Sequence, residues 1–229
     1  MGKYHTVVQG EFLAKIARAY GFASYLSIWG APENKELKEK RKNPNVLYPG
    51  DRLFIPDKET KEESCPTEKK HKFRRQGEDL KLRIVLMGLK NEPLDGHECT
   101  LIIEGGSKDF TTKSNGLLEE DISAKAAVGK LLDNGKPGPE FRTQRQIPLK
   151  IGHLDPVEEL SGQIARLNNL GYNAGEVPEH QLTADQEQEV RKSPQFLSAV
   201  EEFQCDFGLQ VDGICGPQTQ AKLLKEHGC

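Results

Sequence analysis

The sequence predicts a multidomain α+β protein with three units: an N-terminal βααβ unit, a central antiparallel β-sandwich and a C-terminal three-helix domain. Three observations predict this class. The chain of 229 residues exceeds one average domain. A charged stretch follows the first unit, and the spacing of apolar residues then changes from helical to alternating and back. We expect units at residues 1–57, 78–154 and 155–229, joined by a charged linker at 58–77.

The first unit begins with a strand and a turn at residues 4–10. A short helical stripe then ends at Gly21, and a second helix is expected to start near Ser24. Residues 33–42 form a charged insertion, and residues 43–56 supply a turn and the second strand. The stretch that follows is charged and nearly without apolar residues, so burial cannot offset its chain entropy, which indicates a linker.

The central unit shows strict alternation from residue 80 onward. Leu80, Leu82, Ile84 and Leu86 alternate with other side chains, which is typical of a half-buried strand. Five more strands are expected at residues 99–104, 108–112, 117–122, 128–132 and 146–151, separated by glycine turns. Strands of this length and spacing favour a sandwich. This segment carries no clustered His, Asp or Cys, so we expect a spacer or docking domain.

Proline-containing start signals mark three helices in the last unit. Asp155-Pro156 is the expected start of the first, Ser193-Pro194 of the second and Gly216-Pro217 of the third. We expect Ala221 and Leu224 on the inner face of the third helix. A longer acidic segment, residues 177–192, contains a capping-box pattern at Thr183.

The N-terminal unit resembles the LysM domain. The resemblance rests on YHTVVQGEFLAKIARAYG at residues 4–21 and NPNVLYPGDRLFIP at residues 43–56. It implies binding of peptidoglycan or chitin through N-acetylglucosamine, in a groove between two loops. The ligand-binding residues that it implies are Gly10, Glu11, Phe12 and Leu13 in one loop, and Asn45, Val46, Leu47 and Tyr48 in the other.

One departure from the LysM pattern leaves an alternative open. The family's usual Gly-Asp-Thr/Ser is Gly10-Glu11-Phe12 here, which removes a small hydroxyl that could cap the helix. The unit could therefore keep a LysM fold and serve only to dock a protein.

The C-terminal unit resembles a three-helix peptidoglycan-binding domain over residues 157–226. The resemblance rests on LNNLGY at residues 167–172, VEEFQ at 200–204 and LQVDGICGPQT at 209–219. The motif residues that it marks are Phe203, Gln204, Asp212, Gly213, Gly216 and Thr219. We interpret them as structural first, because glycines permit a tight turn there and Asp212 can accept backbone hydrogen bonds.

Composition excludes several other classes of function. The net charge of −3 gives no electrostatic support for nucleic-acid binding, and no apolar run approaches the roughly 18 residues of a membrane span. Six scattered histidines give no metal or hydrolase motif, so we expect no catalytic residues, metal or cofactor, although a hidden carboxylate pair stays open. The five cysteines lack zinc-like spacing. We expect free thiols, with a bridge from Cys205 or Cys229 to Cys215 only after export.

The order of the three units resembles that of proteins associated with bacterial type VI secretion, and residues 40–57 and 152–172 carry this resemblance. It implies a non-catalytic peptidoglycan-binding accessory protein that partners a secretion spike or effector. The first residues lack the apolar segment of a signal peptide, so we expect synthesis in the cytoplasm and action in the periplasm or cell wall after contractile secretion. The alternative is a cytosolic adaptor, chaperone or immunity-like protein that docks an effector.

Overall fold

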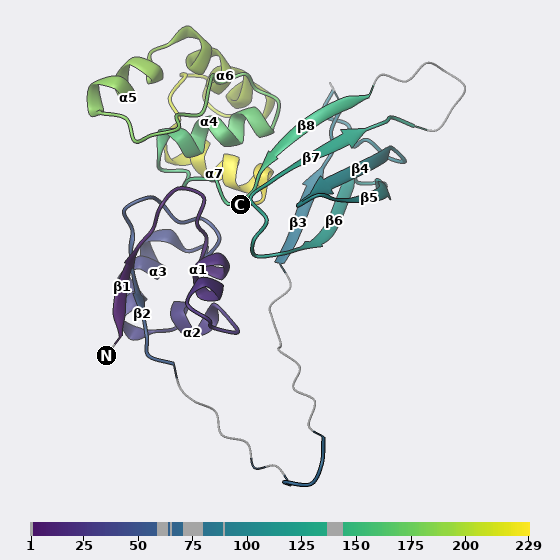
Figure 1. Ribbon diagram of the computed structural model, residues 1–229. Helices are drawn as coiled ribbons and strands as arrows, with labels where there is room; N and C mark the ends of the chain where they lie inside the picture. Colours follow the sequence, from purple (N-terminus) through teal and green to yellow (C-terminus); the bar gives the residue numbers. More distant parts are fainter. Residues whose placement is uncertain (1, 59–63, 65, 71–79, 89, 137–143) are drawn as a thin grey trace. The chain divides into compact units, whose positions relative to one another are not determined.

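The computed structural model describes residues 2–58, 64, 66–70, 80–88, 90–136 and 144–229 (Figure 1). It divides into two compact units, so the N-terminal segment contributes residues to both. The first comprises Met1–His5, Gly10–Asn34 and Phe54–His153, and the second comprises Thr6–Gln9, Lys35–Leu53 and Leu154–Cys229. Most of the linker expected at residues 58–77, Cys65 included, lies outside the described residues.

The N-terminal segment contains the expected strand, helices and strand. Strands β1 (Lys3–Thr6) and β2 (Arg52–Ile55) form a two-stranded sheet. Between them lie α1 (Leu13–Ala19), α2 (Leu26–Trp29), a 3₁₀ turn η1 (Pro32–Asn34) and α3 (Lys35–Arg41). Helix α3 is an addition to the expected pattern, because the charged insertion at residues 33–42 folds into it.

A buried amide joins η1 to the second strand. The side-chain Nδ2 of Asn34 donates to Ile28 O and to Phe54 O, both at 2.8 Å, and its Oδ1 accepts from Phe54 N at 2.7 Å. Asn34 is only 1% exposed. Its side chain therefore pairs with Phe54 as a neighbouring strand would, and satisfies backbone groups that burial would otherwise leave without partners.

All six strands expected in the central segment are present. They are β3 (Leu80–Val85), β4 (Glu98–Ile103), β5 (Gly106–Thr111), β6 (Leu117–Ile122), β7 (Val128–Asp133) and β8 (Arg145–Lys150). Strands β3 and β6 pair antiparallel, and a second antiparallel sheet has the order β5-β4-β7-β8. The glycine turn expected between β5 and β6 lies at Asn115-Gly116, where Gly116 has φ 71° and a methyl group would overlap Leu86 O.

Side chains of both sheets meet in one apolar core. Its buried members are Leu86, Cys99, Leu101, Leu118 and Leu131. Because Leu118 comes from β6 while Leu101 and Leu131 come from the larger sheet, the two sheets pack as the two layers of a sandwich. The mixed α+β class and the central antiparallel sheets are thus confirmed.

All regular elements of the C-terminal segment are helices. Its helices are α4 (Leu160–Asn169), α5 (Ala184–Arg191), α6 (Pro194–Asp206) and α7 (Pro217–His227). The starts predicted at Ser193-Pro194 and Gly216-Pro217 are confirmed. Helix α5 arises in the segment at residues 177–192, where Thr183 and Gln186 form the expected capping box.

The helix start expected at Asp155-Pro156 is wrong. Helix α4 begins at Leu160, after an extended Glu159 with φ −86° and ψ 143°. The preceding chain crosses Gly162 so closely that a methyl group there would overlap the carbonyl oxygens of Asp155 and Pro156. Buried Arg166 then donates from Nη1 to Asp155 O at 2.7 Å, which ties this crossing to the helix.

Helix α7 also turns a different face inward than expected. Thr219 and Leu223 are its buried residues, whereas Ala221 is exposed and Leu224 is 39% exposed. The expectation that Ala221 and Leu224 point inward is therefore wrong. The inward face was misassigned because the buried Thr219 is polar and does not count toward an apolar stripe.

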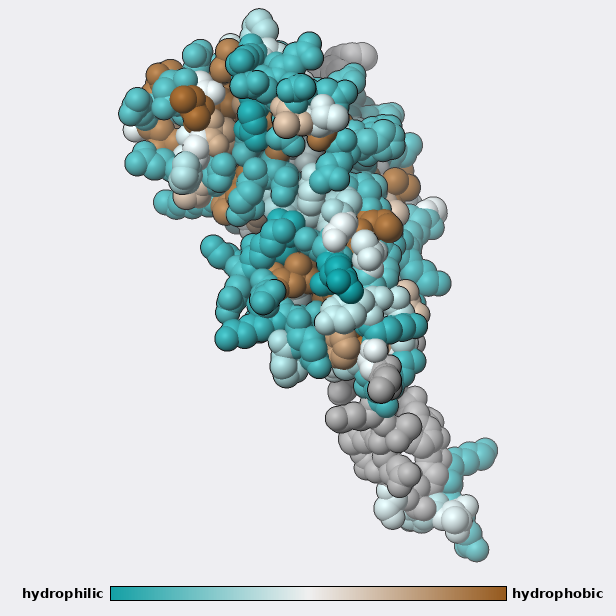
Figure 2. Space-filling view, turned by 90° about the vertical axis from the view of Figure 1, so that its left-hand side faces the viewer, coloured by the Kyte–Doolittle hydropathy of each residue, from teal (hydrophilic) through white to brown (hydrophobic). Residues whose placement is uncertain are grey.

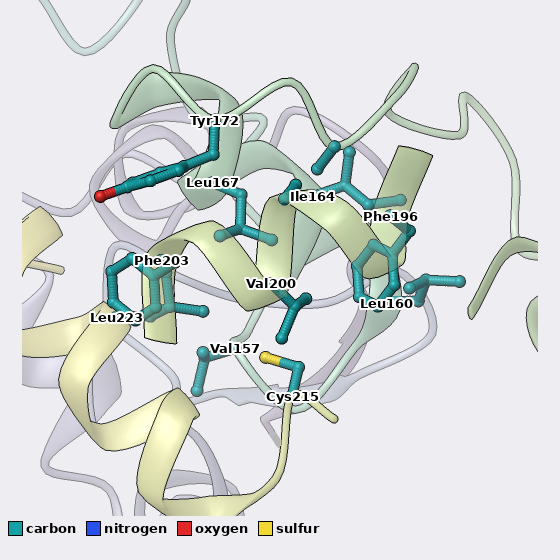
Figure 3. Packing of buried hydrophobic residues seen from close by; sticks show 12 residues of the cluster. Val157, Leu160, Ile164, Leu167, Tyr172, Phe196, Val200, Phe203, Cys215 and Leu223 are labelled. Carbon is teal, nitrogen blue, oxygen red and sulfur yellow. The ribbon is translucent and has the colours of Figure 1, made fainter. Parts of the chain in front are cut away.

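Helices α4, α6 and α7 enclose the core shown in Figure 3, and the partly buried Val190 of α5 packs against it. Phe203 is fully buried beside Tyr172, whose ring meets it edge-on at a centroid distance of 5.5 Å. Leu223 of α7 and Cys215 of the loop before it close the core from the other side. On the outside, Figure 2 shows apolar residues in separate patches among hydrophilic ones.

Candidate binding sites

The loop after β1 is packed rather than open. Gly10 has φ 81°, and its carbonyl accepts from Lys15 Nζ at 2.9 Å. Phe12 stands at the N-cap of α1 and gives no side-chain cap, as the lost hydroxyl predicted. Phe12 is 4% exposed and Leu13 is fully buried, so both side chains face the interior.

Neighbouring groups hold this loop in place. Glu11 Oε2 lies 2.8 Å from Nε2 of His5, and the other ring nitrogen of His5 lies 3.1 Å from the hydroxyl of Tyr20. A methyl group on Gly10 would lie 2.9 Å from Nε2 of His153. Of the four residues expected in this loop, Glu11 is the most accessible, because Gly10, Phe12 and Leu13 are all buried.

The loop before β2 is ordered by a buried ion pair. Arg41 donates from Nε and Nη2 to the two carboxylate oxygens of Asp51, at 2.8 and 2.9 Å. Asp51 also accepts from the backbone N–H of Tyr48 at 3.0 Å. Burial is the largest single influence and would lower the pKa of Arg41, but the hydrogen bond with Asp51 and the attraction of Asp51 and Glu159 together outweigh burial and raise it. Arg41 thus stays charged and fixes the turn at residues 48–51.

The side chains of this second loop point in different directions. Asn45 is exposed, Val46 and Leu47 are buried, and Tyr48 is half-buried. The guanidinium of Arg41 lies over the Tyr48 ring, 5.5 Å from its centroid. Burial, together with nearby carboxylates that include Glu159, raises the pKa of Tyr48, so its hydroxyl remains a neutral hydrogen-bond donor. Sequence reasoning found Tyr48 but missed Arg41, which lies in the charged insertion, and Asp51, which directly follows Gly50.

The C-terminal motif forms one connected network around Gln204, which is 1% exposed. Its Nε2 lies 2.8 Å from Asp212 Oδ1 and 3.1 Å from Thr219 Oγ1. Its Oε1 accepts from the backbone N–H of Asp212 at 2.9 Å and of Gly213 at 3.0 Å. One side chain thereby joins α6 to the loop before α7.

The other motif residues shape the same loop. Gly213 has φ 68°, and Gly216 is the N-cap of α7. The backbone N–H of Ile214 donates to Asp212 and lowers the pKa of that carboxyl, so it stays ionised. The motif thus holds the loop, while the side chain of Ile214 is 64% exposed and faces solvent.

The central segment holds a polar cluster that sequence reasoning did not single out. Asp133 accepts from Arg145 Nη2 at 2.7 Å, from the Gly135 N–H at 2.9 Å, and lies 2.9 Å from Nδ1 of His97. Burial would raise the pKa of Asp133, but these hydrogen bonds lower it. Burial raises the pKa of nearby Cys99 to about 11, so its thiol is protonated. The cluster joins β7 to β8 and to the residue before β4.

The cysteines within the described residues are unbridged. Cys99 and Cys215 are buried, whereas Cys205 and Cys229 are exposed. Across the same ranges, no group of three or more His, Cys, Asp or Glu side chains is placed to hold a metal ion. No helix in the described part of the chain has the length and apolar character that crossing a bilayer requires.

Comparison with protein-family models identifies domains at both ends of the chain. The model described as "Putative peptidoglycan binding domain" matches residues 165–223, from within α4 into α7. The LysM domain model matches residues 5–24, which run from β1 past the end of α1. No curated protein and no solved structure gives a significant match to the chain.

The chain therefore contains a LysM domain and a peptidoglycan-binding domain. Both are binding domains, which supports binding of peptidoglycan and indicates action at the periplasm or cell wall. The LysM match ends at residue 24, so it includes the loop at residues 10–13 and stops before residues 45–48.

Proposed function

We propose that this protein is a non-catalytic accessory factor that binds the N-acetylglucosamine-containing glycan of peptidoglycan. The observation that carries this proposal is the presence of two cell-wall-binding domains in one chain. In the LysM domain, residues 10–13 and 45–48 are the proposed contact loops. In the C-terminal domain, the Gln204 network supports the loop that presents Ile214 to a ligand.

We further propose that the protein acts with a contractile, type VI secretion system. This part rests on the order of the three segments and on the resemblance of residues 40–57 and 152–172 to proteins of such systems. The partner would be a secretion spike or an effector, which the two wall-binding domains would hold at peptidoglycan. Co-purification from producing cells tests this, and failure to retain any spike or effector protein would contradict it.

Sedimentation with purified insoluble peptidoglycan tests the binding function itself. The full chain should move into the pellet, and protein that stays wholly in the supernatant would refute the proposal. Tyr48→Ala should weaken pelleting, because it removes the half-buried ring from a proposed contact loop. Tyr25→Ala is the matched control, since Tyr25 lies at the start of α2 outside both loops.

A second candidate function follows from the packing of the loop after β1, at residues 10–13. Phe12 and Leu13 are buried and so offer no apolar surface to a sugar. This favours an adaptor, chaperone or immunity-like protein that docks an effector in the cytosol. An adaptor should co-purify with an effector in fixed stoichiometry and should not sediment with peptidoglycan. The accessory factor should sediment with peptidoglycan even when no effector is present.

A further inference from the structure

The second unit contains a cavity that neither domain resemblance assigns. Its volume is about 190 Å³, and its walls come from Gln9, from Tyr48 and Pro49, and from residues between 155 and 187. Pockets that enclose whole drug-sized ligands measure about 300–1,000 Å³. This cavity therefore suits one ring of a larger molecule, the rest of which would lie outside.

A buried carboxylate is the main polar group in the cavity wall. Asp155 is 7% exposed, and its Oδ1 accepts from Gln9 Nε2 at 3.3 Å while its Oδ2 accepts from Ser161 Oγ at 2.6 Å. Each carboxylate oxygen carries two lone pairs, so each keeps the capacity to accept one more hydrogen bond. Asp155 is thus held in position by two neighbours while it can still receive a donor from a ligand.

Ring side chains supply much of the apolar part of the wall. It includes the half-buried Tyr48 ring, which the Arg41 guanidinium holds from one side, and the rings of Pro49 and Pro178. Rigid rings lose little conformational entropy when they pack against a ligand. Apolar rings beside carboxylate, amide and hydroxyl groups match a sugar, which has apolar C–H faces and a rim of hydroxyls.

The charge of the side chains that line the cavity determines which component of peptidoglycan it favours. Three carboxylates line the cavity, from Asp155, Glu179 and Glu187, and no Lys or Arg is among the residues that line it in the described chain. The lining also includes the imidazole of His180. Because three carboxylates outnumber this one imidazole, a ligand carboxylate would meet net repulsion there. The acidic stem peptide and the lactyl group of N-acetylmuramic acid are therefore disfavoured, and a neutral sugar is favoured.

We propose that this cavity is a sugar-binding site that takes one neutral N-acetylglucosamine-type ring and is built jointly by residues 9 and 48–49 and by residues 155–187. The inference rests on the proposed function, since it names the component of peptidoglycan that is bound. It differs from the loop assignment, because nine of the twelve lining residues follow residue 154. The LysM domain and the C-terminal domain then share one ligand.

Titration of the full chain with chitotriose, a neutral trimer of N-acetylglucosamine, tests the inference. The cavity variant is Gln181→Ala with Glu187→Ala, two lining residues that are not buried and so should not affect folding. The matched control is Gln188→Ala with Glu189→Ala, which changes exposed residues of the same helix α5 outside the cavity. We expect affinity for chitotriose to fall at least tenfold in the cavity variant and to stay unchanged in the control.

Sedimentation with peptidoglycan, run in parallel, tests the proposed function separately from the cavity inference. If the wild type sediments but does not bind chitotriose, or binds it equally well in the cavity variant, the cavity inference is overturned and the proposed function stands. If the cavity variant instead loses binding of a free stem peptide, the inference is also overturned. If chitotriose binding depends on the cavity while nothing sediments, the cavity inference is supported and the proposed function is contradicted.

Discussion

Replacing Gln204 with alanine tests whether the C-terminal motif is held together by this one side chain. In the folded protein Gln204 Oε1 accepts from the backbone N–H of Gly213, which lies in a buried position. It also bonds to Asp212 and Thr219. Alanine would remove all of these contacts and leave the Gly213 N–H inside the protein without an acceptor.

The expected cost follows from these contacts. A buried donor without a partner costs about 1–3 kcal/mol, and each of the two lost side-chain contacts is worth about 1 kcal/mol, which gives roughly 3–5 kcal/mol. This is a large part of the about 5–15 kcal/mol that stabilises a typical domain. At about 4–8 °C per kcal/mol for a domain of this size, the Tm of the C-terminal domain should fall by at least about 12 °C.

Calorimetry of the full chain, with amide hydrogen exchange at Gly213 as the local measurement, provides the assay. The Gly213 amide should exchange faster in the Gln204→Ala variant. Gln210→Ala is the control, because Gln210 is exposed in the adjoining loop and should leave both measurements unchanged. A fall in Tm of less than about 3 °C, with unchanged exchange at Gly213, would refute the reasoning.

Three further predictions concern the other buried polar groups and the thiols. Asp51→Ala leaves the Arg41 guanidinium buried without its carboxylate and should lower the unfolding free energy by about 3–5 kcal/mol in urea titrations; an unchanged midpoint would contradict this. The lowered pKa of Asp133 gives stability that is complete above the unfolded pKa of about 3.9 and is lost as pH falls through the folded pKa. Asp133→Asn should therefore be less stable than wild type at pH 6, and the gap should narrow toward pH 3; a constant gap would count against the assignment. Burial raises the pKa of Cys215 to about 12, so iodoacetamide followed by peptide mapping should modify exposed Cys205 first. Equal rates in the folded protein would show that Cys215 is accessible.

The strands were predictable because buried and exposed residues alternate along the chain. Leu82 and Ile84 lie on the core side of β3 and alternate with exposed residues, and such a pattern persists in any sheet with one buried face. Helix starts at Ser193 and Gly216 were predictable for a similar reason, since cap and proline signals act within a few residues.

Features that depend on distant contacts were not predictable from the sequence. Helix α3 was interpreted as an insertion because its buried residue is the charged Arg41, whose partner Asp51 lies beyond the helix. Asp155 carries a good cap signal, yet the chain there is held across Gly162 instead of entering the helix. The cavity could not be foreseen either, because its walls come from segments far apart in sequence, such as Gln9 and Ser161.

The two outer strands of the larger sheet have a consequence for how the protein behaves at high local concentration. Strand β5 is almost wholly exposed and carries Lys108 and Asp109, while β8 at the opposite edge contains Pro148, which has no N–H to donate. Charged side chains and proline both hinder an edge strand from pairing with the edge of another molecule. Many copies could therefore crowd along one insoluble polymer without their sheets joining into aggregates, so each copy would remain an independent binder.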